Sequence, residues 1–596
     1  MPIEKRTIFA SIALIVILGF SLYFNSLNGK FLWDDKYLVK ENKHIQNFSY
    51  VPKVFTENIG TGAHRTYHFY RPLQTLSYMI DYSIWKLDVK GYHLTNILLH
   101  ILVALAIYWL VSILFKDTLL SFLASIFFLA HPIHAGPISY ISARANSMVA
   151  LFMFLAFVFY IKSLDAKKPI LLLLMILSYI ASLLSRENSL ILPVLLLVYH
   201  LAFQKKIKLK PFVTLAGMSL VYIVLRAGVF RYKLTHEISN STIGQRMPGV
   251  FVALANYLRI LCAPFHLHVD YGEKLFSWNN PQAIIGVLLF LGLVALVWKN
   301  RKGKNLVFFS ISWFFVALIP LANIYPINAY MSVGWLHVPS IGFFLLLAKA
   351  LSYLLKTQKF RAFALILIIT LISFYSGLTI RENTYWREPK TLYERTLKYV
   401  PDSEMAYNNL GILYGDMKNF KKAISLFEKA VKLNPKNGEP HHNLGQAYSF
   451  IGNREKAIAS YDRAVELYPD PLDDARTYHR LGDLYNDIGD QEEAISSYKK
   501  AIESNPNYLK AYNNLGALYS SRNEIEKAVE VLTKLIEIDP QNAGAYINLS
   551  AAHYRSGKYE LAVQYFHKAQ SLGMNSPALL EVLKPYLKNK LGVISQ

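Results

Sequence analysis

The chain has 596 residues, of which 53% are hydrophobic, and its formal net charge is +23. Such a charge can indicate a nucleic-acid partner, but residues 1–380 contain 35 Lys or Arg and 13 Asp or Glu, whereas residues 381–596 contain 28 and 27. The single cysteine, Cys262, excludes an intramolecular disulfide and disfavours a thiolate metal site. We therefore expect two unlike halves, one basic and apolar and one soluble and nearly neutral, and no nucleic-acid partner.

Apolar segments in the first half predict a polytopic membrane helix bundle. Segments of about 18 to 23 residues cross a hydrocarbon core at a rise of about 1.5 Å per residue. Lys-rich connectors at 205–210, 299–304 and 356–361 are typical of cytoplasmic loops. An odd number of spans with a cytoplasmic N-terminus puts the second half on the extracytoplasmic side. We predict about eleven spans and an interfacial helix at 246–263; the spans lie near 8–27, 92–115, 119–135, 146–163, 169–186, 188–203, 211–230, 281–298, 305–322, 333–355 and 362–380.

Two adjacent carboxylates, Asp34 and Asp35, follow the first span directly. Two acids at a membrane boundary are costly, which suggests a function, although a solvated turn that closes a helix is the simpler interpretation. The loop that contains them, 28–91, is longer than a connector needs and includes Arg71 in an aromatic, basic string. We expect this loop to fold back on the membrane as short amphipathic helices.

Cationic and imidazole side chains near the outer ends of other spans favour an anion site, such as one for a lipid-linked phosphate. Each arginine alone could instead extend to lipid head groups. The histidines lack a thiolate or acid neighbour, which makes a metal cage unfavourable and a role as hydrogen-bond donors more plausible. We expect Glu187 to orient the arginine beside it. The candidate phosphate-binding residues are Arg71, His131, His134, Arg144 and Arg186.

A carboxylate that faces an anion site can act as a general base. It would take the proton of an incoming hydroxyl while a sugar phosphate leaves from the opposite face, and this single displacement inverts the anomeric centre. A neighbouring carboxylate raises one pKa of the pair and arginines lower it. The residues therefore leave open whether Asp34 or Asp35 is the base.

The second half contains a Leu-Gly-x-x-Tyr pattern with a period of 34 residues, at Gly411 and Gly445 and again at Gly482 and Gly516. This period, with Ala, aromatic and Pro residues at fixed offsets, predicts tetratricopeptide repeats that stack into an α-solenoid. We assign 381–403 to a linker helix or half repeat, 404–576 to five repeats, and 577–596 to a capping helix. Three extra residues at 471–473 predict a longer loop.

The residue before each Leu-Gly pair is expected to face the concave groove of the solenoid. A ladder of amides there can bind the backbone of an extended peptide without reading its sequence. The alternative is that these amides satisfy neighbouring groups of the same chain. The predicted groove residues are Asn409, Asn443, Arg480, Asn514 and Asn548.

Several motifs in order along the chain resemble the transmembrane and tetratricopeptide repeat-containing protein family. They are Trp33-Asp34-Asp35, residues 70–73, 92–96 with His100, 131–134, 185–187 and 339–342, and Trp386 before the repeats. The resemblance implies a C-type glycosyltransferase fold, no metal, and an activity like that of the protein O-mannosyltransferases that use dolichyl phosphate mannose in the lumen of the endoplasmic reticulum. It also implies that Asp34 or Asp35 is the catalytic base. Departures at Ala135-Gly136 and Asn146 suggest a prokaryotic relative with a polyprenyl-phosphate sugar donor.

The sequence thus predicts an all-α protein with a catalytic first outer loop at 28–91. The predicted function is transfer of a hexose, such as mannose, to Ser or Thr of an exported polypeptide held by the repeats. No cofactor is expected; the partners are the lipid-linked donor, the polypeptide and the bilayer. The membrane would be the cytoplasmic membrane, or the endoplasmic reticulum in a eukaryote. The alternative is a membrane-anchored repeat scaffold without enzymatic activity.

Overall fold

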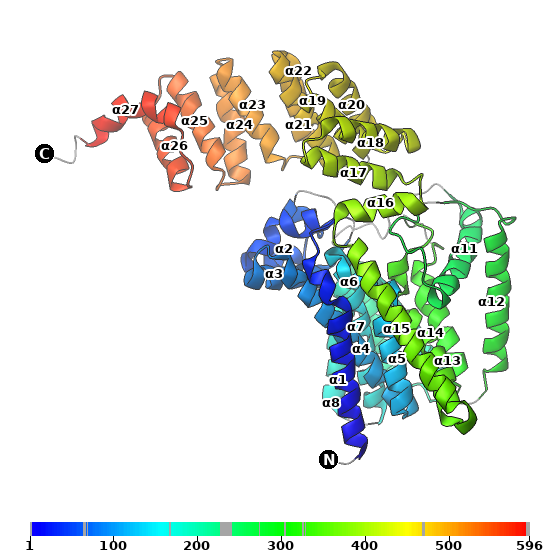
Figure 1. Ribbon diagram of the computed structural model, residues 1–596. Coiled ribbons are helices and arrows are strands. Elements are labelled where there is room, and N and C mark those ends of the chain that lie inside the picture. Colours follow the sequence, from blue (N-terminus) through cyan, green and yellow to red (C-terminus); the bar gives the residue numbers. More distant parts are fainter. Residues whose placement is uncertain are drawn as a thin grey trace. The chain divides into compact units, whose positions relative to one another are not determined.

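The computed structural model describes residues 3–63, 67, 69–165, 168–226, 241–272, 274–302, 305–324, 327, 329–467 and 471–591. Every regular element in these residues is helical, which confirms the predicted all-α class there (Figure 1). The chain divides into two compact units, residues 1–406 and residues 407–596. The predicted linker helix or half repeat at 381–403 therefore belongs to the first unit.

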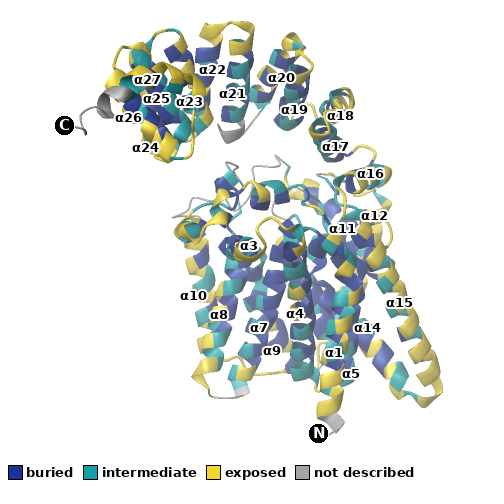
Figure 2. Ribbon diagram, turned by 60° about the vertical axis from the view of Figure 1, so that its left-hand side comes forward, coloured by how far each residue is buried: buried dark blue, intermediate teal, exposed yellow. Residues whose placement is uncertain are grey.

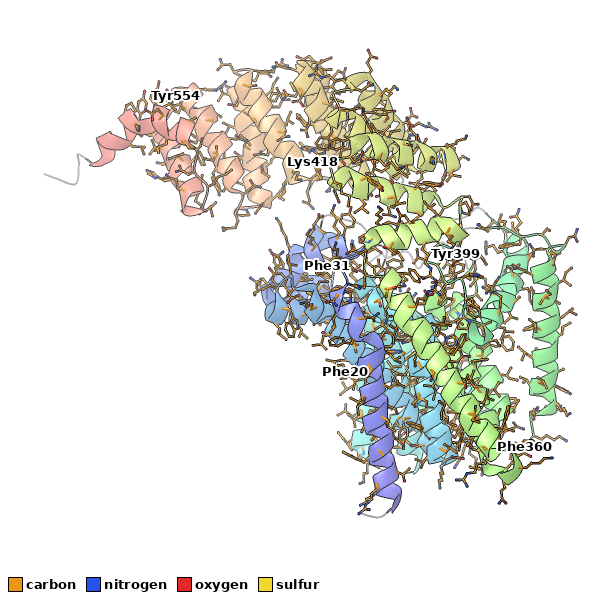
Figure 3. The ribbon with its side chains drawn as sticks, viewed as in Figure 1. Phe20, Phe31, Phe360, Tyr399, Lys418 and Tyr554 are labelled. Atoms are coloured by element: carbon orange, nitrogen blue, oxygen red, sulfur yellow. The ribbon has the colours of Figure 1, made fainter. Side chains whose placement is uncertain are left out.

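The first unit is a bundle of long helices with short helices at one end. Phe360 lies at the end of the bundle that also holds the N-terminus, and Phe31 and Tyr399 lie at the opposite end (Figures 1 and 3). Helices α2, α3, α6 and α16 lie at that opposite end (Figure 1). The helices are α1 (Ile3–Tyr23), α2 (Val51–Val54), α3 (Pro72–Trp85), α4 (Val89–Phe115), α5 (Thr118–Ala130), α6 (Ala135–Ser139), α7 (Ala145–Asp165), α8 (Pro169–Ser185), α9 (Leu192–Phe203), α10 (Leu209–Val224), α11 (Ile243–Cys262), α12 (Pro281–Lys299), α13 (Leu306–Leu318), α14 (Ser340–Lys356), α15 (Arg361–Tyr385) and α16 (Pro389–Tyr399).

The prediction of about eleven spans is wrong when spans are counted by the length and composition of the helices. Among the described residues, five helices are long and apolar enough to cross a membrane, and six if α5 and the bent segment after it count as one span. Helix α5 ends at Ala130, just before Pro132, whereas the apolar pattern had extended this span to residue 135, and residues 227–230 of another predicted span lie outside the described part of the chain. The five candidates are Lys5–Asn28, Val89–Phe115, Ile141–Leu164, Pro281–Lys299 and Gln358–Tyr385. Shorter apolar helices are Pro169–Ser185, Glu187–Phe203, Leu209–Val224 and Leu306–Leu321.

Burial separates inner from outer helices in this unit. The apolar window of Ile141–Leu164 is 67% buried and that of Val89–Phe115 is 56% buried, whereas the windows of Pro281–Lys299 and Gln358–Tyr385 are 11% and 22% buried. Many residues of α10 and α15 are coloured as exposed, whereas those of α7 are mostly coloured as buried (Figure 2). Because α7 is at the centre, the residues that lead into it are surrounded by protein. A helix that is apolar all round and exposed suits a lipid environment.

The second unit is an array of paired helices with the predicted repeat chemistry. A Cβ added at Gly411, Gly445 or Gly482 would lie 2.4 to 2.8 Å from the ring of the aromatic residue in the paired helix. The glycine therefore lets two helices approach, as the repeat pattern predicts. In the fifth repeat, Ser550 replaces the glycine and its hydroxyl donates to the carbonyl of Ala562 at 2.6 Å.

The helices of the array differ from the expectation at one loop. The three residues expected to lengthen the loop at 471–473 instead begin α21, where Pro471 occupies a favourable first position. At the C-terminal end, Leu583 of α27 packs against Phe566, and residues 592–596 of the predicted cap lie outside the described part. The helices are α17 (Glu404–Asp416), which begins before the boundary, α18 (Phe420–Leu433), α19 (Gly438–Phe450), α20 (Arg454–Leu467), α21 (Pro471–Ile488), α22 (Gln491–Ser504), α23 (Leu509–Ser521), α24 (Ile525–Ile538), α25 (Ala543–Arg555), α26 (Tyr559–Ser571) and α27 (Pro577–Leu591).

Candidate active site

Asp35 is a fully buried carboxylate with several donors around it. Its Oδ2 accepts a hydrogen bond from the backbone N–H of Leu32 at 2.9 Å. Its Oδ1 accepts one from the backbone N–H of Ser142 at 2.8 Å and another from the Ser142 hydroxyl. Burial outweighs these bonds and raises the pKa of Asp35 to about 7. Asp35 is 0% exposed, so a bulky substrate has no access to it.

Because Asp35 is buried, we expect the free energy of unfolding to depend on pH. Its pKa is higher in the folded chain than in the unfolded chain, so its contribution is present at low pH and is lost as the pH rises towards about 7. From pH 5 to pH 8 this loss is about 3 kcal/mol at 1.36 kcal/mol per pKa unit. We expect Asp35→Asn to destabilise the protein more at pH 5 than at pH 8 in thermal unfolding. The control is Asp88→Asn at an exposed helix cap, which should change the thermal stability by the same amount at both pH values. Equal effects of Asp35→Asn at both pH values would contradict this origin.

Asp34 has a more open environment than its neighbour. It is half-buried, and both of its carboxylate oxygens accept hydrogen bonds from phenols. Tyr67 donates to Oδ1 at 3.0 Å and Tyr140 donates to Oδ2 at 2.8 Å. Neither tyrosine was assigned a role from the sequence, because Tyr140 lies 106 residues away from Asp34. Of the two carboxylates, Asp34 is therefore the one that a substrate hydroxyl can approach.

The short segment 140–146, which links α6 to α7, joins the carboxylates to a predicted arginine. Its turn is a 3₁₀ helix at Ile141–Arg144. Ser142 lies in this turn, and Asn146 follows four residues later in the first turn of α7. The same short segment thus contacts both carboxylates and one guanidinium. Tyr140 bonds to Asp34, Ser142 bonds to Asp35, and Asn146 Oδ1 accepts a hydrogen bond from Arg186 Nη1.

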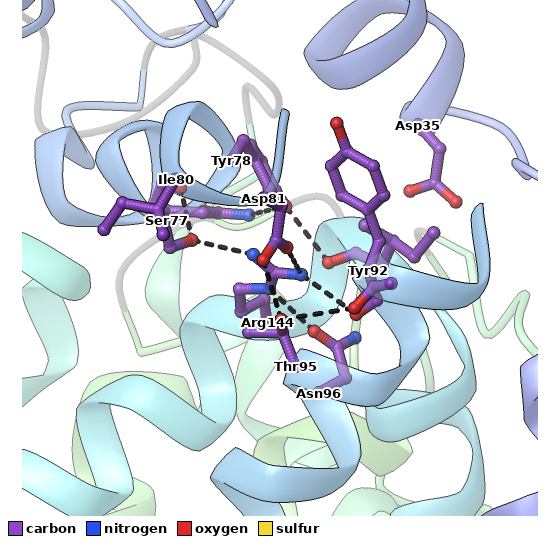
Figure 4. A network of polar contacts seen from close by, with 12 residues as sticks. Asp35, Ser77, Tyr78, Ile80, Asp81, Tyr92, Thr95, Asn96 and Arg144 are labelled. Atoms are coloured by element: carbon purple, nitrogen blue, oxygen red, sulfur yellow. Dashed lines mark hydrogen bonds and ion pairs between the residues drawn. The ribbon is translucent and has the colours of Figure 1, made fainter. Parts of the chain in front are cut away.

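Arg144 lies in the same segment but in a closed network of its own (Figure 4). It is 0% exposed, it pairs with Asp81 at 2.6 Å, and its guanidinium lies 4.8 Å from the ring centroid of Tyr78. Its other donors bind the Asn96 side chain at 2.7 Å, the Ser77 hydroxyl at 3.0 Å and the Tyr92 carbonyl at 3.0 Å. This geometry gives no support to a phosphate contact by Arg144. Its observed role is to anchor segment 140–146 to α3 and α4.

Three other arginines gather around one carboxylate. Arg71 and Arg226 lie 3.4 and 3.5 Å from the two oxygens of Glu187, and Arg186 precedes Glu187 in the chain. Burial would raise the pKa of Glu187, but Arg71, Arg226 and Arg186 outweigh it and lower this pKa to about 2. Three guanidiniums and one carboxylate leave a net charge of about +2. We call Arg71, Arg186, Arg226 and Glu187 the arginine cluster.

The arginine cluster can bind a further anion. The Nε atoms of Arg71 and Arg186 are buried and have no hydrogen-bond partner among the described residues. Buried donors without partners are costly, and guanidinium groups suit phosphate oxygens. Arg226 was missed in the sequence because its position falls within a predicted span. The structure therefore brings two predicted arginines together with a third and with the predicted orienting residue Glu187.

The two predicted histidines lie outside this cluster. His131 Nε2 lies 3.1 Å from the carbonyl oxygen of Leu261, and His134 Nδ1 lies 3.2 Å from Nδ1 of His337. Within the described residues, no hydrogen bond joins either histidine to the arginine cluster, and no group of three His, Cys, Asp or Glu residues could hold a metal ion. The phosphate contact of the histidines and the absence of a metal both stay predictions.

The aromatic rings around Asp34 require a glycine. The ring of Tyr140 stacks on Trp386 with centroids 5.9 Å apart, and Trp386 covers Gly136 of α6. A Cβ at Gly136 would lie 2.6 Å from the indole ring. We expect Gly136→Ala to destabilise the protein by about 1 to 3 kcal/mol through overpacking. The control is Gly377→Ala in α15, where an added Cβ would have no neighbour within 4 Å among the described residues. Equal losses of thermal stability in the two variants would contradict this prediction.

The predicted groove residues of the repeats contact the preceding repeat. Asn443 donates to Asn408 and Asn548 donates to Asn513, each at 2.9 Å. These bonds agree with the alternative that the amides satisfy neighbouring groups, at least in part. Arg480 and Asn514 also line one cavity of about 590 Å³, with Asp483 between them as a bonding partner of both. The cavity gives the array a polar recess in addition to the amide ladder.

Comparison with known families identifies the repeats. Tetratricopeptide repeat family models match residues 402–470, 437–505, 497–530 and 543–572, and a TPR repeat model matches residues 516–557. Among solved structures, MamA protein is 32% identical with a TM-score of 0.27 and covers 29% of this chain and 92% of its own. YrrB, a TPR protein with an unusual peptide-binding site, is 17% identical with a TM-score of 0.28 and covers 32% of this chain and 97% of its own.

Curated relatives match beyond the repeats. The human protein O-mannosyl-transferase TMTC3 is 25% identical over 461 residues, which cover 69% of this chain and 50% of that protein. The Caenorhabditis elegans protein O-mannosyl-transferase F38B6.6 is 25% identical over 428 residues, which cover 68% of this chain and 60% of that protein. The chain thus spans about half to three-fifths of the length of these relatives. The chain thus contains tetratricopeptide repeats and is similar over about two thirds of its length to these protein O-mannosyl-transferases.

Proposed function

We propose that this membrane protein is a glycosyltransferase that moves mannose, or a similar hexose, from a polyprenyl-phosphate donor to Ser or Thr of an exported polypeptide. One observation carries the proposal: segment 140–146 contacts both the half-buried carboxylate of Asp34 and Arg186 of the arginine cluster, and so links the two groups. A carboxylate can take a proton from a hydroxyl, and guanidiniums can hold a phosphate. The relatives' name, protein O-mannosyl-transferase, supports this chemistry.

Asp34 is the general base in this scheme. The acceptor hydroxyl gives its proton to Asp34 while its oxygen forms a bond to the anomeric carbon of the donor sugar. The bond from that carbon to the phosphate oxygen breaks, and its electron pair leaves with the polyprenyl phosphate. The attack and the departure occur on opposite faces, so the anomeric centre inverts. Asp35 is buried beneath this site and acts through the shape of the loop, because three donors already bind its oxygens.

The arginine cluster would hold the phosphate throughout the displacement. A sugar phosphodiester carries one negative charge and the leaving monoester carries up to two, so negative charge grows as the bond breaks. A site with a net charge of about +2 stabilises this growing negative charge, since preorganised positive charges stabilise the negative charge that develops in the transition state. The proposed reaction thus takes its positive charge from side chains of this chain and is metal-independent.

The repeats would hold the acceptor polypeptide. Tetratricopeptide arrays present extended concave surfaces, and the recess with Arg480 and Asn514 offers polar partners. The proposed location is the cytoplasmic membrane, or the endoplasmic reticulum in a eukaryote, with the N-terminus in the cytoplasm and the repeats on the other side. The Lys-rich connector that contains Phe360, at the end of the bundle that also holds the N-terminus, supports this orientation (Figure 3).

The test is mannose transfer by the purified full chain in detergent or nanodiscs. Polyprenyl-phosphate mannose and a Ser/Thr-rich peptide would be supplied, and the glycopeptide would be followed by mass spectrometry and by the configuration of the new linkage. We expect an inverted linkage on Ser or Thr. Failure of the wild type to transfer mannose, glucose or galactose from such donors, with retained binding of the peptide, would overturn the enzyme and favour the non-enzymatic scaffold.

A further inference from the structure

We propose that Tyr140 is a positioning residue that holds the Asp34 carboxylate in its reactive orientation, an inference that rests on the proposed function. The Tyr140 phenol makes two contacts with the same residue. It donates to Asp34 Oδ2 at 2.8 Å and accepts from the backbone N–H of Asp34 at 3.3 Å. The two bonds fix both the carboxylate and the peptide group that carries it.

Two indole rings stack on the ring of Tyr140. Trp33 stacks on it with centroids 6.1 Å apart, Trp386 stacks on it at 5.9 Å, and both pairs have an interplanar angle of 26°. Trp33 has a φ of 48°, which is unfavourable for a bulky residue. Strain of this kind persists only where the surroundings impose it. These stacked rings thus connect the first outer loop, segment 140–146 and the end of α15.

A second phenol fixes the rotation of the same carboxylate. Tyr67 donates to Oδ1 at 3.0 Å while Tyr140 donates to Oδ2, so each oxygen is tied to its own donor. A free carboxylate of Asp rotates readily about its last bond. With both oxygens tied, Asp34 presents the same lone-pair directions to each incoming hydroxyl. Loss of one phenol would allow misorientation, and a small misplacement of a reacting group can cost about 10²-fold in rate.

Tyr140 acts through Asp34 and does not take the proton itself. Burial, followed by the charge of Asp34, raises the pKa of Tyr140 well above its usual value. The phenol therefore stays protonated and remains a donor before and after the transfer. The proton of the acceptor goes to Asp34, as in the proposed reaction.

The test is a kinetic double-mutant cycle with Tyr140→Phe and Asp34→Asn. Phenylalanine keeps the stacked ring and removes only the hydroxyl. We expect Tyr140→Phe to lower kcat about 10- to 100-fold with KM for the donor unchanged, and to have no further effect in the Asp34→Asn background. Tyr160→Phe is the matched control, because it removes another buried hydroxyl, bonded to His200 at 2.6 Å, and should leave kcat unchanged.

The outcomes separate this inference from the proposed function. An unchanged kcat for Tyr140→Phe in an active protein would overturn the positioning role alone. An equal loss in both Asp34 backgrounds would also overturn it, since a merely structural role reduces the rate regardless of Asp34. An inactive wild type would overturn the proposed function, and with it the positioning role of Tyr140 in catalysis. In that case a thermal-stability cycle of the same two substitutions should still show coupling between the two residues.

Discussion

Replacement of Asp34 by Asn is expected to abolish most mannose transfer, with kcat reduced about 10²- to 10⁴-fold. The amide keeps the shape of the side chain but cannot take the proton of the acceptor hydroxyl. Donor binding should be retained, because the arginine cluster is unchanged. The measurement is the steady-state rate with polyprenyl-phosphate mannose, together with the equilibrium binding of the donor to the variant.

Asp35→Asn serves as the comparison within the same pair. It is fully buried, so we expect it to act on folding, with a loss of thermal stability and a smaller loss of kcat in the protein that remains folded. An Asp34→Asn variant with full activity and an inactive but well-folded Asp35→Asn variant would reverse the assignment of the base. Full activity of both would remove the pair from the mechanism.

The difference between the two carboxylates was not predictable from the sequence. Acidic residues are scarce in the basic half of the chain, and this scarcity was enough to identify Asp34 and Asp35 as a candidate pair. The choice between them depends on burial, and burial depends on Tyr140 and Ser142, which lie more than a hundred residues later in the chain. A single sequence carries no signal for such pairing. Only the structure indicates that one acid is covered while the other can be reached.

The repeats were predictable for a local physical reason. In the first three repeats, a glycine and an aromatic residue 16 positions later meet across two helices, as Gly411 and Phe427 do. Contacts at a fixed spacing leave a period in the sequence. The membrane half lacks such a rule, because apolar residues serve both lipid-facing and buried helices. Composition therefore predicted the bundle, but it overestimated the number of helices that are long enough to cross a membrane.

The arginine cluster illustrates the same limit. Arg71 and Arg186 stood out because they lie in polar connectors, whereas Arg226 lies at the end of an apolar segment. Arg144 looked equivalent to them, yet Asp81 neutralises it in a closed network. Charge and position along the chain do not distinguish an arginine that is already paired within the fold from one that is available to a ligand. The distances from each guanidinium to its neighbouring acids separate the paired arginine from the available ones.

Removal of one cation from the arginine cluster is expected to weaken the hold on the leaving phosphate. Arg71→Gln lowers the net charge from about +2 to about +1, and we expect kcat/KM for the donor to fall about 10²- to 10³-fold, as on loss of a transition-state donor. The polyprenyl monophosphate product should also inhibit the variant less strongly than the wild type. The reason is that a dianion gains more from each positive charge than a monoanion does.

The control is Lys30→Gln, which removes one positive charge from an exposed ion pair with Glu388 in the same unit. Salt screens such exposed charges, so Lys30→Gln should leave both kcat/KM and product inhibition unchanged. If the two variants behaved alike, a general effect of net charge would explain the result. If Arg71→Gln reduced kcat/KM but left inhibition by the monophosphate unchanged, the guanidinium would act on the sugar or the acceptor instead of the phosphate. Only a fall in kcat/KM for the donor together with weaker inhibition by the monophosphate shows that the arginine cluster binds the leaving phosphate.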